Sequence, residues 1–383
     1  MEPAMLLDVR DLHIEFRTRD GVARAVNGVD YGVEEGRTLA VLGESGSGKS
    51  VTAQAVMGIL DSPPGRITRG EIRFQGRDLL TLSEKERRAV RGPGMAMIFQ
   101  DALSALNPVL SVGEQLGEMF TVHRGMRRKE ARTRAVELME RVGIPGAEER
   151  VRQYPHQFSG GMRQRIMIAM ALSLEPSLII ADEPTTALDV TVQAQVMELL
   201  AELQRELGMG MVLITHDLGV VADVADRIAV MYAGRIVETA PVHDIYRAPA
   251  HPYTRGLLES IPRLDQKGRE LYAIKGLPPN PAAVPPGCAF HPRCPLARAV
   301  CRTDEPPLYE VTAGRGSACH FWRETLALAR EPSGERPPPG AGEPPAPGTG
   351  TAPGSAPGSG VPEPARAPGS GDDGDGDRGR SDG

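Results

Sequence analysis

Hydrophobic and polar positions follow two different periods along the first 240 residues. From 5 to 42, apolar and polar residues alternate around Gly and Asp, with a turn at Asp20-Gly21, which predicts an antiparallel sheet. Short, almost wholly apolar runs follow at 38–42, 95–99, 178–182 and 211–215. Runs of this kind are typical of parallel strands that are buried on both faces. The pattern therefore predicts an α/β fold closed by a hairpin over 227–238.

Helical patterns separate these strands. We expect helices over 51–60, near 83–90, over 127–142 and over 192–207. Residues 101–157 contain no strand pattern, so they are predicted to form an inserted helical subdomain. From about 330 to 383 the chain is rich in Pro, Gly and Ser and has almost no large apolar residue, which predicts a disordered tail.

One motif lies between the run at 38–42 and the helix that follows it. It is Gly43-Glu44-Ser45-Gly46-Ser47-Gly48-Lys49-Ser50, followed by Val51. Glycines at this spacing let backbone N–H groups surround a phosphate at a helix N-terminus. A lysine in this position reaches the β- and γ-phosphates, and the serine hydroxyl binds Mg²⁺. A flexible turn is the alternative, but the flanking strand and helix favour a phosphate loop.

Carboxylates end the third apolar run. Asp182 is predicted to hold Mg²⁺ opposite Ser50, and Glu183 is placed to take a proton from a water that attacks the γ-phosphate. Gln100 and His216 also follow strands, where an α/β sheet presents groups to ligands, although each signal is weak alone.

A second helix start carries Ser159-Gly160-Gly161-Met162-Arg163-Gln164. Such a start can bind an anion, because its N–H groups point outward and the helix dipole is positive there. Taken alone, the segment is better explained as an ordinary N-cap made by Ser159.

Charge and hydropathy exclude some classes of protein. The chain has 44 Lys and Arg against 50 Asp and Glu, for a net charge of −6, so nucleic acid is not expected as the main partner. No apolar run reaches the length of a membrane span, and the N-terminus lacks the pattern of a secretory signal. We expect a soluble cytosolic protein whose membrane role, if it has one, comes through a partner.

All four cysteines fall in one short, proline-rich region: Cys288, Cys294, Cys301 and Cys319. This uneven distribution in a cytosolic protein favours a metal site over disulfides. Four sulfur ligands suit either Zn²⁺ or an iron–sulfur cluster, and their spacing does not decide between the two.

Taken together, the motifs resemble the ATP-binding cassette family over residues 5–240. The resemblance rests on the phosphate loop, Gln100, the Ser159–Gln164 segment, Asp182-Glu183, Ala187-Leu188-Asp189 and His216. It implies the cassette ATPase fold, with cassettes paired head to tail and each ATP held between one phosphate loop and the partner's Ser-Gly-Gly segment. It also implies that Gln100 contacts metal and water, Glu183 is the general base, His216 senses the γ-phosphate, and Ser159, Gly160, Gly161, Gln164 and Asp189 act at the interface.

Two further segments are similar to the oligopeptide, dipeptide and nickel importer branch of that family. They are 250–258, which contains His251-Pro252-Tyr253, and the loop 99–108 after Gln100, where Ala102 replaces the usual Pro. The resemblance implies a C-terminal domain over 241–329 with a [4Fe–4S] cluster on the four cysteines. We favour the cluster over Zn²⁺, and four free thiols are the third alternative.

The same resemblance implies the partners and location of the chain. These are a second cassette subunit, two permeases and, indirectly, an extracytoplasmic solute-binding protein, with the chain on the cytoplasmic face of the membrane. The alternatives are nickel as cargo, a cassette protein that acts on nucleic acid or ribosomes, and an iron–sulfur redox protein with a regulatory cassette.

Overall fold

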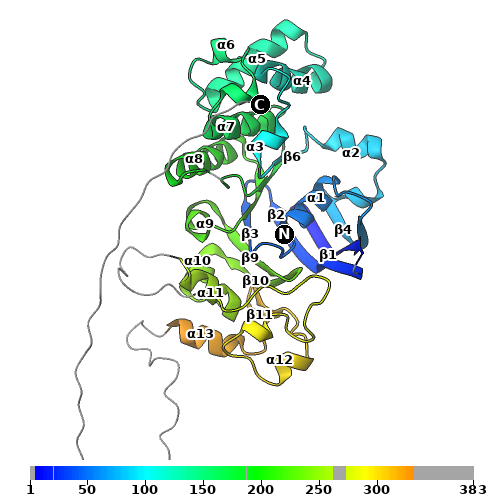
Figure 1. The fold of residues 1–383 in the computed structure, drawn as a ribbon, viewed down its shortest axis with the longest axis vertical. Helices are drawn as coiled ribbons and strands as arrows, with labels where there is room; N and C mark the ends of the chain where they lie inside the picture. The colour runs from blue at the N-terminus through cyan, green and yellow to red at the C-terminus, as the bar shows by residue number, and fades with distance from the viewer. Residues whose placement is uncertain (1–4, 20, 187, 262–272, 331–383) are drawn as a thin grey trace, which may run out of the picture. The chain divides into compact units, whose positions relative to one another are not determined.

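Two sheets form the framework of the molecule (Figure 1). The computed structural model describes residues 5–19, 21–186, 188–261 and 273–330, so Asp20, Ala187 and the predicted tail from 331 lie outside the described residues. The smaller sheet is antiparallel, in the order β2-β1-β4-β5. Its strands are β1 (Met5–Thr18), β2 (Gly21–Glu34), β4 (Gly65–Phe74) and β5 (Arg77–Asp78). The alternating pattern at 5–42 predicted an antiparallel sheet, and this prediction is confirmed for β1 and β2, whereas residues 38–42 belong to the larger sheet.

The larger sheet has the order β11-β12-β10-β9-β3-β8-β7-β6. Its parallel part comprises β6 (Met95–Ile98), β7 (Leu178–Asp182), β8 (Gly210–Thr215), β3 (Thr38–Leu42) and β9 (Arg227–Tyr232). Antiparallel pairing continues through β10 (Arg235–Pro241), β12 (Arg315–Ser317) and β11 (Tyr309–Thr312). The predicted α/β fold is confirmed.

Strand β3 shows why the central strands are apolar on both faces. Leu39 and Val41 belong to a core shared with the antiparallel sheet and helix α1 (Lys49–Met57). Ala40 and Leu42 belong to a second core on the side of the helical insertion. Successive side chains of a strand point to opposite faces, so one strand supplies both cores. Thr38 to Leu42 are all buried as a result.

The insertion after β6 is helical, as predicted. It contains α3 (Ala102–Ala105), α4 (Val112–Arg124), α5 (Arg128–Arg141) and α6 (Ala147–Arg150). Helix α4 begins with a capping box, in which Ser111 and Glu114 bond each other's backbone N–H, and it ends at the left-handed Gly125. The remaining helices before β10 are α2 (Glu84–Val90), α7 (Gly160–Leu172), α8 (Val190–Leu207) and α9 (Leu218–Val224).

The region after β10 is joined to the main sheet. It includes α10 (Val242–Arg247), α11 (Pro252–Glu259), α12 (Val300–Thr303) and α13 (Trp322–Arg330). Strand β12 pairs with β10, and the buried Glu238 of β10 accepts the N–H groups of Ala250 at 2.7 Å and His251 at 2.9 Å. Arg315 of β12 lies 3.4 Å from the same carboxylate. A hydrogen-bonded and paired buried charge of this kind ties the segments together, because removal of either partner would leave the other charge buried and unpaired.

Candidate functional site

The phosphate-loop motif joins β3 to α1, as the sequence predicted (Figure 1). Gly48, the N-cap of α1, has φ 104°, a conformation that favours glycine. A Cβ atom at this position would also lie 2.4 Å from the carbonyl oxygen of Ala25. The backbone can therefore make this turn only because residue 48 has no side chain.

Lys49 lies inside the loop. Its Nζ donates to the carbonyl oxygens of Gly43 at 2.7 Å and Glu44 at 3.1 Å. Burial lowers the pKa of Lys49, while the charges of Glu183, Asp182 and Glu44 act in the opposite direction. A buried ammonium group surrounded by carbonyl oxygens is well placed to meet a phosphate that enters the loop.

Ser50 of α1 and Asp182 at the end of β7 form a hydrogen bond. The Ser50 hydroxyl donates to Asp182 Oδ1 at 2.9 Å, although 132 positions separate them in sequence. Burial raises the pKa of Asp182, and the hydrogen bond from Ser50 opposes this shift. Both side chains offer oxygen atoms, the ligands that Mg²⁺ prefers, so this pair fits the metal that the sequence predicted.

Glu183 has polar neighbours on one carboxylate oxygen. Its Oε2 accepts from Gln100 Nε2 at 3.1 Å and from the Thr186 hydroxyl at 3.0 Å, and it lies 3.5 Å from His216 Nδ1. Its backbone, directly after the last residue of β7, has φ 46°, a strained conformation for a residue with a side chain. Gln100, Glu183 and His216 were predicted separately and are brought together here. Thr186 was not among the predicted site residues.

The Ser-Gly-Gly segment begins α7 at a different place in the chain. Ser159 is the N-cap of α7, and Asp189 is the N-cap of α8. The two helices pack closely, because a Cβ at Gly161 would lie 2.6 Å from Val192 Cγ1. Helix α7 packs against the helical insertion, β6 and α8, whereas α1 packs against β2, β6 and β7. Ser159 and Asp189 are therefore brought near each other at the starts of two packed helices, whereas β6 lies against both α7 and α1.

Comparison with known proteins identifies the family. Residues 26–186 match the ABC transporter family, and residues 237–301 match the oligopeptide/dipeptide transporter C-terminal region. The oligopeptide transport ATP-binding protein OppD of Bacillus subtilis is 52% identical over 333 residues, which cover 87% of this chain and 92% of the relative. The chain belongs to the ABC transporter family. It is an ATP-binding subunit of that family, whose members hydrolyse ATP.

Other comparisons agree with this assignment to the ABC transporter family. The dipeptide transport ATP-binding protein DppD of Bacillus subtilis is 54% identical over 296 residues, 77% of this chain and 88% of the relative. Among solved structures, the dimeric ATP-binding cassette MJ0796 in a post-hydrolysis state with ADP and phosphate is 28% identical, with a TM-score of 0.56 over 62% of this chain and 98% of that one. The predicted cassette fold is confirmed.

Two residues beyond the ABC motifs contact the phosphate loop. The Glu44 backbone N–H donates to Tyr253 Oη at 2.8 Å, and the Glu44 carboxylate accepts from both terminal nitrogens of Arg293, at 2.6 and 2.9 Å. The sequence predicted neither contact. Tyr253 was noted only as part of segment 250–258, which resembles the importer branch. The sequence pattern around Arg293 indicated no role for it beyond its position next to Cys294.

Two more predicted residues of the ABC motifs are oriented toward the protein interior. Gln164 is buried in α7, and its Nε2 atom has no hydrogen-bond partner among the described residues. Val51 is half-buried against the core that includes α1.

The four cysteines line one cavity in the C-terminal region, together with His251 and Phe290. All are free thiols. Burial raises the pKa of Cys294 to about 11 and that of Cys319 to about 12. Among residues 5–330 that the structure describes, no three His, Cys, Asp or Glu side chains stand in an arrangement that would hold a metal ion. The thiols therefore share a cavity without metal-ligand geometry.

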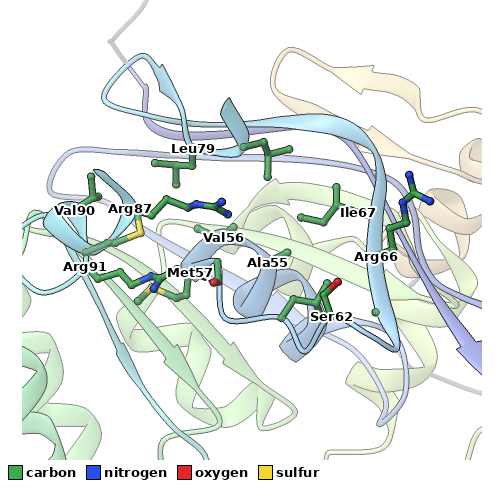
Figure 2. A pocket seen from close by; sticks show the side chains of 15 residues that line it. Ala55, Val56, Met57, Ser62, Arg66, Ile67, Leu79, Arg87, Val90 and Arg91 are labelled. Atoms are coloured by element: carbon green, nitrogen blue, oxygen red, sulfur yellow. Dashed lines mark hydrogen bonds between the residues drawn. The ribbon is translucent and has the colours of Figure 1, made fainter. Parts of the chain in front are cut away.

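A larger cavity, of about 290 Å³, lies at the other end of α1 from the phosphate loop (Figure 2). Val56 and Met57 of α1, Ile67 of β4 and Arg87 of α2 line part of it. Arg91 also lines it and donates to the carbonyl oxygens of Met57 at 2.8 Å and Gly58 at 2.7 Å. This cavity is distinct from the candidate nucleotide site, because Lys49 and Ser50 stand at the first turn of α1.

None of the described helices is long and apolar enough to cross a membrane.

Proposed function

We propose that this chain is the ATP-hydrolysing subunit that powers import of dipeptides or oligopeptides across the cytoplasmic membrane. The observation that supports the motor most directly is the 2.9 Å contact of Ser50 with Asp182, beside the buried Lys49. The peptide cargo is supported by the names of relatives at about half identity and by the match to their C-terminal region.

The phosphate loop would bind the triphosphate of ATP. Lys49 would exchange the carbonyl oxygens of Gly43 and Glu44 for phosphate oxygens. Ser50, Asp182 and Gln100 would hold Mg²⁺, which neutralises charge on the transferred phosphoryl group when bound. The other loop residues, Ser45, Gly46, Ser47, Gly48 and Val51, would supply the backbone that surrounds the phosphates.

Glu183 would act as the general base. Its carboxylate can accept the proton of an attacking water. Gln100 and Thr186 donate hydrogen bonds to Oε2 of this carboxylate, and His216 lies beside the same oxygen. The hydrogen bonds fix the direction of the carboxylate before ATP arrives. His216 would then contact the γ-phosphate.

The second phosphate-binding surface would belong to a paired cassette. Ser159, Gly160, Gly161, Gln164 and Asp189 would face the nucleotide of the partner. The dimeric solved cassette with ADP and phosphate supports such pairing. We propose a different second ATPase subunit, two permeases and, through them, a solute-binding protein as partners. The chain would then lie at the cytoplasmic face of the membrane.

Replacing Lys49 by Ala is expected to raise the dissociation constant for ATP at least tenfold, because the buried ammonium group faces the phosphates. A tenfold change corresponds to about 1.4 kcal/mol. Binding of a fluorescent ATP analogue to the full chain measures it. The exposed Lys129 of α5 provides a control, since Lys129→Ala removes the same charge elsewhere. Unchanged affinity in Lys49→Ala would refute the assigned nucleotide site.

The cargo requires a separate experiment. The complex purified through this chain, with its permeases and solute-binding protein, is reconstituted in lipid vesicles. Peptide should stimulate ATP hydrolysis by the wild-type complex and should accumulate inside the vesicles. With the Lys49→Ala complex, neither stimulation nor accumulation is expected. Stimulation by Ni²⁺ but not by peptide would establish the nickel alternative. Recovery of ribosomes or nucleic acid in place of permeases would contradict transport.

We also propose a metal site on the four cysteines, with a [4Fe–4S] cluster favoured over Zn²⁺. The four thiols line one cavity, and four thiolates are the usual ligands of either group. Because the described side chains do not stand in metal-ligand geometry, binding would require them to turn toward a common centre. When bound, such a group would join Cys288, Cys294, Cys301 and Cys319 into one crosslinked unit.

Cys294→Ser is expected to lower the metal content of the purified chain several-fold, because one of the four ligands is lost. Elemental analysis for iron, zinc and acid-labile sulfide measures the content, and visible absorption reports a cluster. The control is Ser317→Ala, which changes a buried residue of β12 outside the cysteine set. Equal content in wild type and Cys294→Ser, or no metal in either, would exclude the site.

A further inference from the structure

Glu44, the second residue of the phosphate loop, is held on two sides by the C-terminal region. We propose that Tyr253 and Arg293 are positioning residues for ATP binding, which act through Glu44. The proposal rests on the nucleotide site assigned above. It adds two residues that lie 209 and 249 positions beyond Glu44 in the sequence.

Tyr253 fixes the backbone of the loop. Its hydroxyl oxygen accepts the N–H of Glu44 at 2.8 Å, while the carbonyl oxygen of Glu44 accepts from Lys49 at 3.1 Å. Both polar groups of this residue's main chain therefore have partners, and its orientation is set. Tyr253 is fully buried, so its hydroxyl cannot move far without loss of packing.

Arg293 fixes the side chain of Glu44. The guanidinium group makes a two-point contact with the carboxylate, at 2.6 and 2.9 Å, and the Arg293 side chain is only 5% exposed. Two-point pairs of this kind are strong and directional. The pair also neutralises a carboxylate whose charge acts on Lys49. Without Arg293, that negative charge would remain beside a site for negatively charged phosphates.

Arg293 itself is held by several groups. It donates to the carbonyl oxygen of Lys275 at 3.2 Å and lies 3.4 Å from Tyr232 Oη. The ring of Phe290 packs at 5.3 Å from the rings of both Tyr232 and Tyr253. Arg293 directly precedes Cys294, and Phe290 lines the cysteine cavity. The segment that carries the cysteines therefore anchors the phosphate loop.

A purely structural bond between the two regions is the alternative. Arg235 and Glu305 form such a bond, at 2.5 Å, and neither belongs to the phosphate loop. A structural role predicts lower thermal stability with unchanged ATP affinity. A positioning role predicts that loss of Arg293 weakens ATP binding. A second substitution at Glu44 should then restore part of the affinity, because it removes the carboxylate that was left unpaired.

The test measures ATP affinity, thermal stability and turnover on the full chain. Arg293→Gln is expected to raise the dissociation constant for ATP about tenfold, and the Glu44→Gln/Arg293→Gln pair only about threefold. Turnover at saturating ATP should stay within about twofold in Arg293→Gln, because the base, the metal ligands and the residues of the phosphate loop are untouched. Arg293→Lys should restore part of the affinity. The Arg235→Gln control should keep its affinity, and its stability should change little because that pair is more exposed.

Tyr253→Phe gives an independent variant, since it keeps the ring and removes only the acceptor for the Glu44 N–H. Affinity should fall several-fold, because a buried N–H is left without a partner. This variant decides the matter if Arg293→Gln does not fold. Wild-type affinity in Arg293→Gln, or in Tyr253→Phe where the former does not fold, would overturn the proposal. Loss of binding in Lys49→Ala would show that the nucleotide site itself still stands.

Discussion

Glu183→Gln is expected to lower the rate of ATP hydrolysis by about two to four orders of magnitude, the usual contribution of a general base. The substitution keeps the size of the side chain and its contacts with Gln100 and Thr186, but an amide cannot accept the proton of the attacking water. ATP affinity should stay near that of the wild type, because Lys49, Ser50 and Asp182 are unchanged. Phosphate release and nucleotide binding on the same preparation measure the two effects.

The same variant should also accumulate the paired, ATP-bound state. ATP favours the state in which two phosphate-binding surfaces reach it, and slow hydrolysis leaves that state populated. Size-exclusion chromatography of this variant together with the proposed second ATPase subunit, with and without ATP, reports the pairing. Glu202→Gln, an exposed carboxylate of α8, serves as the control and should hydrolyse ATP normally. Undiminished turnover in Glu183→Gln would show that another group takes the proton.

Local sequence patterns predicted most of the helices and strands, because burial, helix capping and backbone conformation depend on residues that are close in the sequence. The apolar run at 38–42 is wholly buried because parallel strands between two cores need side chains that are apolar on both faces. Ser83 and Ser159 each cap a helix where the sequence placed its start. Backbone geometry likewise needs glycine where the phosphate loop turns. Such constraints act over a few residues, and the sequence displays them directly.

Contacts between distant segments were less predictable. An Arg such as Arg293 finds a carboxylate 249 residues away, and many other acidic residues offer the same chemistry. The pairing of β12 with β10 has the same character, because β12 spans only three residues and has no pattern of its own. The meeting of Gln100, Glu183 and His216 lies between these cases. Each follows a strand of one parallel sheet, so their shared edge could be expected although their distances could not.

Ser159→Arg is expected to reduce ATP hydrolysis by the assembled complex at least about a hundredfold, while ATP binding to the isolated chain stays unchanged. Ser159 caps α7, where it accepts the N–H of Met162 at 3.4 Å, and α7 packs against α8 and the helical insertion. If this helix start faces the γ-phosphate of a paired cassette, a long side chain there prevents closure and leaves this chain's own phosphate loop intact.

A matched control separates this effect from loss of a helix cap. Ser111 also caps a helix, α4, and Ser111→Arg should cost about 1 kcal/mol of stability with little change in turnover. Both variants are compared in the complex purified through this chain, by phosphate release and by ATP-dependent pairing in the Glu183→Gln background. Lys49→Ala should show the opposite behaviour to Ser159→Arg, with binding lost in the isolated chain. Normal pairing and turnover in Ser159→Arg would mean that α7 does not face a partner's nucleotide, and the motor would then need a different second phosphate-binding surface.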